Sequence, residues 1–293
     1  MFEQVVSILF PVFALASVGF VIGRWIKPDF RPINRINMDV CIPALVFASL
    51  TSMPLDTEQL PLISASLVAL LVPGILMIPI CKMAGINFKA WAPPHMFRNS
   101  GNLAIPLFTY TFGESALAPA VLLFVVSACV HISVGLALLS NGNPLKQIFS
   151  MPIFLAAALA LFLNLADIEV WTPLYEASSL LGQAAVPIML LSLGSQMVNL
   201  RLSGLKVGLF STCQSIATGA VAFAIIYFFI PLPTLHLQMM VLFTMLPPAV
   251  MNYLFAERFH VEPTNVASMV LFGNFLSVIT LPILLTFALS LSA

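Results

Sequence analysis

Residues 98–106 read Arg-Asn-Ser-Gly-Asn-Leu-Ala-Ile-Pro, and they lie inside an apolar segment, residues 91–112, that is long enough to cross a membrane. The stretch holds a cation, two amides, a hydroxyl group, a glycine and a proline. In hydrocarbon an unpaired backbone group is costly, so irregular backbone at that depth occurs only where it is buried in protein or lines a wet cavity. A polar stretch with helix-disrupting residues inside a membrane segment therefore predicts a ligand site.

The composition of the whole chain is that of a polytopic membrane protein. Of its 293 residues, 60% are hydrophobic and 8% are charged, and the mean hydropathy is +1.07, whereas a soluble domain carries about 25% charged residues. The net charge of zero leaves no basic face for nucleic acid. Four cysteines stand singly in apolar runs, so we expect packing residues and neither a metal site nor a cofactor. They are Cys41, Cys81, Cys129 and Cys213.

Apolar runs between polar breaks predict ten membrane-spanning helices. Most approach the length of about 20 residues that a spanning helix needs, although the second is borderline and the sixth is short. The ten segments are 3–25, 37–53, 60–82, 91–112, 115–140, 150–166, 174–198, 203–230, 236–257 and 263–290.

The distribution of charge supports this count independently. If the N-terminus lies outside, every basic residue falls in an inner stretch or at an adjoining helix end, which is the positive-inside pattern. A missed or extra helix would break the pattern from that point onward. We therefore predict a multi-pass protein of the bacterial inner membrane with both termini on the outer, periplasmic side. The basic residues are Arg24, Lys27, Arg31, Arg35, Lys82, Lys89, Arg98, Lys146, Arg201, Lys206 and Arg258.

Ten helices divide into two units of five, residues 1–140 and 141–293, and an odd unit repeated in tandem inserts upside down the second time. Residues 42–50 and 186–193 each place a proline between apolar residues and a serine shortly after it. The fourth helix of each unit combines proline with an amide. Interrupted spans at matching positions of two halves point to a transporter site. We therefore predict a 5+5 inverted repeat whose helices 4 and 9 are broken and cross.

A broken helix supplies the chemistry for binding an anion. The start of a half-helix carries free N–H groups and roughly +0.5 of a charge, so two such ends near each other attract a carboxylate without a buried Lys or Arg. For the amides and the serine, the alternative is a role as polar glue between packed helices. The predicted substrate-binding residues are Asn99, Ser100, Gly101, Asn102, Pro106, Pro247, Pro248 and Asn252.

Three other polar residues are candidates for coupling transport to Na⁺ or H⁺. They are Asp39, His131 and Asn274, and the alternatives are an ion pair with a nearby arginine, a packed neutral histidine and a packing amide. For Arg98 we favour a side chain that snorkels to the cytoplasmic interface over one that lines an inner vestibule. We expect His95 to be interfacial as well.

Four motifs together resemble the auxin efflux carrier family, which includes plant auxin carriers and bacterial malonate-type carriers. They are residues 42–47 (Ile-Pro-Ala-Leu-Val-Phe), 99–106 (Asn-Ser-Gly-Asn-Leu-Ala-Ile-Pro), 185–194 (Ala-Val-Pro-Ile-Met-Leu-Leu-Ser-Leu-Gly) and 273–282 (Gly-Asn-Phe-Leu-Ser-Val-Ile-Thr-Leu-Pro). The resemblance implies a fold like that of bile-acid/sodium symporters. It also implies a scaffold of helices 1, 2, 6 and 7, a transport domain of helices 3–5 and 8–10 that moves in an elevator-like manner, and a homodimer.

These observations predict a secondary transporter of small organic anions that works by alternating access in a lipid bilayer. The alternative is a membrane sensor or receptor that uses the same pocket without translocation. We expect no enzyme, because no motif of a hydrolase, metalloprotease or nucleotide-binding site occurs in a usable context.

Overall fold

The computed structural model describes residues 2–53, 59–139, 151–200 and 202–291, and every regular element within these ranges is a helix. The all-α class predicted from composition is therefore confirmed. Two of the basic residues used in the charge count, Lys146 and Arg201, lie outside the described residues.

Seven continuous helices in the described ranges are long and apolar enough to cross a membrane. Of the other predicted segments, 150–166 holds one short apolar helix, and 91–112 and 236–257 are each interrupted. The seven are Val5–Ile26, Arg31–Ser52, Gln59–Ala84, Glu114–Leu139, Thr172–Asn199, Leu205–Phe229 and Pro263–Ser290.

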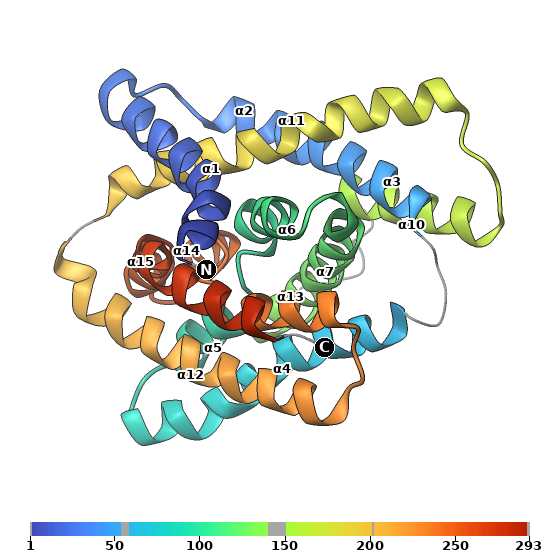
Figure 1. The fold of residues 1–293 in the computed structure, drawn as a ribbon. Helices are drawn as coiled ribbons and strands as arrows, with labels where there is room; N and C mark the ends of the chain where they lie inside the picture. The colour runs from blue at the N-terminus through green and yellow to red at the C-terminus, as the bar shows by residue number, and fades with distance from the viewer. Residues whose placement is uncertain (1, 54–58, 140–150, 201, 292–293) are drawn as a thin grey trace.

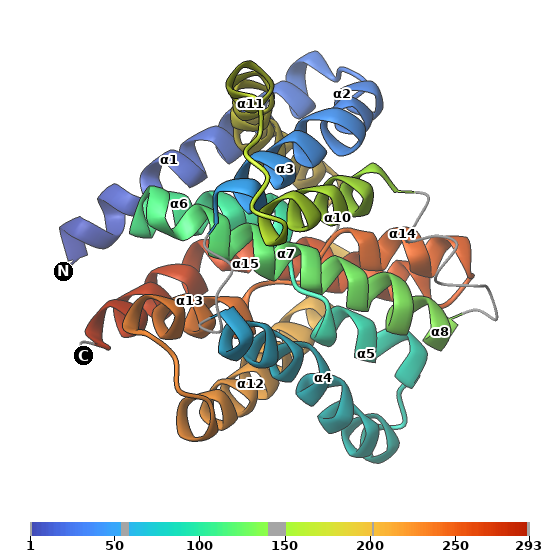
Figure 2. The same ribbon diagram turned by 90° about the vertical axis from the view of Figure 1, so that its right-hand side faces the viewer.

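The helices form two groups, which lie at the top and the bottom of Figures 1 and 2. The upper group joins helices from both halves of the chain, and its members pack on one another. They are α1 (Phe2–Val21), α2 (Arg31–Ile36), α3 (Ile42–Ser52), α10 (Pro152–Leu165) and α11 (Thr172–Gln196).

Glycines bring the upper helices into backbone contact. A Cβ atom at Gly19 of α1 would collide with the carbonyl of Leu191, and one at Gly194 of α11 would collide with the carbonyl of Ala16. Small residues at such crossings let apolar membrane helices pack closely, because van der Waals contact replaces the hydrophobic effect as the driving force in lipid.

The lower group again combines the two halves of the chain. The first turn of α1 and the last turn of α15 lie on the same side of the molecule (Figure 2). The members of the lower group are α4 (Gln59–Ala84), α5 (Phe88–Met96), α12 (Leu205–Phe229), α13 (Thr234–Met245), α14 (Met251–Arg258) and α15 (Pro263–Ser290). Between the groups lie α6 (Ile105–Phe112) and α7 (Leu117–Val130), and α8 (Leu136–Leu139) follows α7.

Two segments that cross between the groups are interrupted. The helix α5 ends at Met96, and helical structure resumes only at Ser100. The helix α13 ends at Met245, and α14 begins at Met251. Pro247 and Pro248 account for the second break, because a proline has no N–H group to donate along a helix. The two breaks meet in an isolated antiparallel bridge between Arg98 and Pro248.

The described chain contains four widened turns of π-helix, within or at the ends of its helical segments. Two of them, η2 (Asn37–Cys41) and η3 (Ser100–Ala104), end two residues before a proline, Pro43 and Pro106 respectively. A proline ring clashes with the carbonyl four residues earlier, so the turn before it widens. The other two are η1 (Ile22–Ile26) and η5 (His131–Gly135).

Candidate functional site

The two breaks satisfy each other's backbone. The N–H group of Asn99 donates to the carbonyl of Pro247 over 2.8 Å, and the N–H group of Ala249 donates to the carbonyl of Phe97 over 3.0 Å. Irregular backbone survives at membrane depth only when its polar groups are paired inside the protein, and this pairing meets that condition.

Three asparagines fasten the crossing. Asn252 Nδ2 donates to the carbonyls of Phe97 and Ala249, each over 2.9 Å. Asn274 Nδ2 donates to the carbonyl of Pro248 over 3.0 Å, while its Oδ1 accepts from Asn99 Nδ2 over 2.8 Å. The crossing is thus tied to α15 as well as to itself.

A glycine makes room for this link. A Cβ atom at Gly273 would lie 2.7 Å from Pro248 Cδ, which is closer than real side chains approach. This close approach at Gly273 brings its neighbour Asn274 within reach of the second break.

Arg98 lies inside the protein, so the prediction that it snorkels to the interface is wrong. The residue is only 1% exposed, and its guanidinium donates to both oxygens of Ser215 and, over 3.3 Å, to the carbonyl of Leu246 at the end of α13. Because the chain is extended at the first break, the side chain turns into the protein, where the carbonyl of Leu246 is one that a helix end leaves free. The ion pairs of the described residues involve Asp29 and Asp39, so no carboxylate neutralises Arg98.

The prediction for His95 is wrong for a similar reason. Its side chain is fully buried, and Nδ1 lies 2.6 Å from the carbonyl of Trp91 one turn earlier. The helix α5 packs against α4, α12 and α15, so its last turn lies in protein rather than at a membrane surface.

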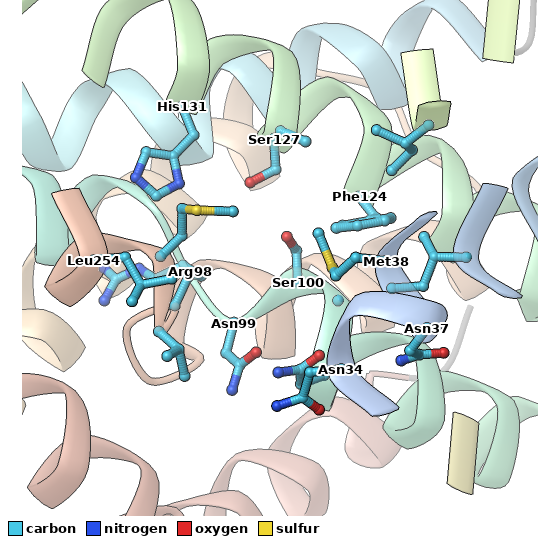
Figure 3. A pocket seen from close by; sticks show the side chains of 18 of the residues that line it. Asn34, Asn37, Met38, Arg98, Asn99, Ser100, Phe124, Ser127, His131 and Leu254 are labelled. Atoms are coloured by element: carbon cyan, nitrogen blue, oxygen red, sulfur yellow. The ribbon is translucent and has the colours of Figure 1, made fainter. Parts of the chain in front are cut away.

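A cavity of about 230 Å³ lies beside the crossing, between the two groups of helices. Figure 3 shows side chains converging on it from four segments of the chain: Asn37 and Met38 from η2, Ser100 from η3, Phe124 and Ser127 from α7, and Leu254 from α14. Ser100 points toward Met38 and Phe124, whereas Asn99 points to the other side of its segment, toward its partner on α15.

Two helix starts open onto this cavity. The N–H groups of Gly101 and Asn102 come at the beginning of the helical run 100–112, and those of Val250 and Met251 come at the beginning of α14. None of the four has an acceptor among the described residues. They are the N–H groups that a helix cannot satisfy internally, and they carry the positive end of its dipole.

The side chains of the cavity add further free hydrogen-bonding groups. Asn34, Asn37, Asn102 and Ser127 line it, and none of these side chains has a hydrogen-bond partner in the described part of the chain. No Asp or Glu is among the described lining residues, and apolar side chains such as Ile42 and Phe124 cover the rest of the wall. A mainly apolar cavity with several free polar groups and no negative charge suits a small amphipathic anion.

Three of the widened turns meet at this cavity. Asn37 of η2, Gly101 of η3 and His131 of η5 all line it. Widened turns occur preferentially at functional sites, since they displace side chains from regular helical positions.

The structure thus divides the predicted substrate residues into two sets. Asn99, Ser100, Gly101 and Asn102 line the cavity, and within this set the Asn99 amide is committed to Asn274. The other set lies at the crossing or in the helix beyond it: Pro247, Pro248, Asn252 and the buried Pro106.

The three coupling candidates are separated. His131 lines the cavity and stacks on Phe97 with ring centroids 4.0 Å apart. Asn274 is part of the crossing. Asp39 is half-exposed outside the cavity, with its carboxylate 3.5 Å from the guanidinium of Arg35, which is the ion-pair alternative considered for it.

The sequence reasoning missed several lining residues, among them Asn34, Asn37, Ser127 and Gln196. Two signals were available. Asn34 and Asn37 are three residues apart, and Ser127 and His131 are four apart, so each pair shares one face of a helix. Neither pair lies in a segment that the internal repeat singled out.

Comparisons with known proteins identify the class. Residues 141–285 match the sequence model of a family described as "Membrane transport protein". A protein of Methanothermobacter thermautotrophicus strain Delta H, described as an "Uncharacterized transporter", is 26% identical over 298 aligned residues that cover 96% of both chains. The chain is therefore a multi-pass membrane transporter. Both similarities agree with the motifs, and they confirm the resemblance to a family of membrane transport proteins.

Proposed function

We propose that this transporter is a secondary carrier of small organic carboxylates that works by alternating access. The observation that carries the proposal is the meeting of two helix starts at one cavity, with the N–H groups of Gly101, Asn102, Val250 and Met251 free of protein acceptors. Such groups bind anions through hydrogen bonds and through the helix dipole together.

The charge around the cavity supports an anionic substrate. Arg98 lies next to the cavity, buried and without a carboxylate partner, and the described lining contains no acidic side chain. A buried positive charge is costly in hydrocarbon. A bound carboxylate would offset that cost, whereas a cationic substrate would increase it.

The proposed arrangement in the membrane is that of ten spans in a 5+5 inverted repeat, residues 1–140 and 141–293. The seven continuous spans, the short α10 and the two interrupted segments add up to that number. The upper group of helices would be the scaffold and the lower group, with α6 and α7, the part that moves as an elevator. A homodimer in the bacterial inner membrane with both termini outside completes the proposal, and these points rest on the family resemblance and on the charge pattern.

Coupling to protons fits His131 best among the three candidates. His131 lines the cavity, and its buried ring is a titratable group. Asp39 lies outside the cavity and Asn274 is committed to the crossing. No observation favours the sensor alternative over a carrier.

Uptake of radiolabelled dicarboxylates and aromatic acids into proteoliposomes tests the proposal. Asn102→Ala removes a free amide donor from the cavity, and a hydrogen bond to a charged group contributes enough that uptake efficiency should fall about tenfold or more. The matched control is Asn265→Ala, which removes an amide that bonds to Glu262 at the start of α15, away from the cavity. Undiminished uptake by Asn102→Ala, or binding of a carboxylate without any flux, would contradict the proposal.

A further inference from the structure

A second, larger cavity lies on the other side of the crossing, and the carboxylate site does not use it. It is a groove of about 650 Å³ between α1, the end of α11 and α15. Its walls are largely apolar and include Val12, Phe20 and Val278. Two further lining residues, Leu103 and Asn274, belong to the region of the crossing.

The groove has the length of one membrane leaflet. From Val12 to Arg24 it follows α1 and η1 for 12 residues, which corresponds to about 18 Å at the rise of a helix. Half of the hydrocarbon core of a bilayer measures about 15 Å. An acyl chain standing in the groove would therefore reach from the polar surface to the level of Val12.

The end of the groove at Arg24 carries a free positive charge. Arg24 lines it, is exposed and forms no ion pair with any described residue. The next residue, Trp25, is 77% exposed. Exposed tryptophans gather at the level of the lipid headgroups, so Trp25 places Arg24 at that level too. An arginine there meets phosphate, with which its planar fork pairs in two parallel hydrogen bonds.

We propose that this groove binds one acidic phospholipid, with an acyl chain between α1 and α15 and its phosphate at Arg24. A zwitterionic lipid has the same chains but offers Arg24 no net negative charge. Because α1 and α15 belong to different groups of helices, the bound lipid contacts both. Nothing in this proposal depends on which solute the carrier moves.

Native mass spectrometry of the full chain, with phosphatidylglycerol and phosphatidylcholine of identical acyl chains offered together, tests the site. The wild type should retain phosphatidylglycerol preferentially. Arg24→Gln should lower that preference about fivefold, the effect of one basic residue near an anionic surface. The matched control is Lys82→Gln, which removes another exposed, unpaired cation. Lys82 lies at the end of α4 and does not line the groove.

A second pair of variants tests the walls. Val278→Trp fills the groove from α15 and should lower retention of both lipids, whereas Ile279→Trp adds the same ring beside it, on a residue that does not line the groove. Equal retention of the two lipids by the wild type would overturn the proposal, as would a preference unchanged in Arg24→Gln. Full retention in a folded Val278→Trp variant, or displacement of phosphatidylglycerol by a transported carboxylate, would overturn it as well.

Discussion

Two helix crossings in this protein both rely on glycine for close approach, but they satisfy their backbone hydrogen bonds in different ways. Where α1 meets α11, Gly19 and Gly194 let two unbroken helices touch, and each helix satisfies its own backbone. Where the two breaks meet, Gly273 lets Pro248 approach α15, but the backbone is paired across the chain, from Asn99 to Pro247 and from Ala249 to Phe97. Only the second arrangement leaves backbone N–H groups free to bind a ligand, so the breaks in the helices are what create the binding site.

Removing the buried charge should damage the polar crossing most. Arg98→Met removes the donor to the carbonyl of Leu246 and the charged partner of both oxygens of Ser215. Since each buried unsatisfied group costs about 1–3 kcal/mol, we expect the free energy of unfolding in detergent micelles to fall by about 3 kcal/mol and uptake to be lost. Arg98→Lys, which keeps the charge and up to three donors, should lose less. A methionine variant that is as stable and as active as the wild type would contradict the role assigned to Arg98.

The apolar crossing should respond to size instead. Gly194→Leu places a side chain where the backbone of α1 already lies. Overpacking of this kind costs about 1–3 kcal/mol, so thermal unfolding should shift downward while the protein that remains folded binds substrate normally. Val18→Leu, on the exposed side of α1, serves as the control and should change little. A lowered affinity at unchanged stability would show that the α1–α11 contact belongs to the site.

The link between the crossing and α15 should have a smaller effect. Asn274→Ala removes the donor to Pro248 and the acceptor for Asn99, and we expect a loss of about 1–2 kcal/mol in unfolding free energy. Ser277→Ala removes only a hydroxyl that bonds to its own helix, and it should stay within about 0.5 kcal/mol of the wild type. Equal stability of the two variants would show that the crossing does not depend on α15.

The smallest effect is expected outside both crossings. Asp39 is about half-exposed, with 49% of its side chain accessible and an ion pair of 3.5 Å to Arg35. Exposed pairs of this kind contribute about 0–1 kcal/mol. Uptake by Asp39→Asn should therefore stay within about twofold of the wild type at each pH tested. A loss of pH dependence in this variant would assign coupling to Asp39 and remove it from His131.

The fold was predictable where it follows from hydropathy and from special residues. The apolar segments became helices, and both predicted interruptions fall at the stretches that combine glycine or proline with an amide. The roles of individual polar residues were less predictable. Asn99 and Asn102 are three residues apart and look alike in the sequence, yet one is bonded to Asn274 and the other faces the cavity. Which of the two asparagines faces the cavity depends on how the two broken segments pair with each other.

Arg98 shows the same limit more clearly. Charge counting places it with the residues of the inner side, and a long side chain near a helix end normally reaches for water. The non-helical backbone at 97–99 directs the side chain into the protein instead. There the guanidinium donates hydrogen bonds to acceptors in α12 and at the end of α13. No pattern within residues 91–112 contains those acceptors, so the sequence of the segment alone could not reveal them.

The widened turns around the cavity have a consequence for how relatives should be compared. A π turn holds one residue more than the helix needs, so it behaves as a one-residue insertion that rotates everything beyond it by about 100°. Deleting one residue from 37–41, 100–104 or 131–135 would restore a regular helix and point different side chains at the cavity. A single-residue gap at any of these positions in a related carrier would therefore identify one that keeps the same membrane topology but surrounds its substrate with a different set of side chains.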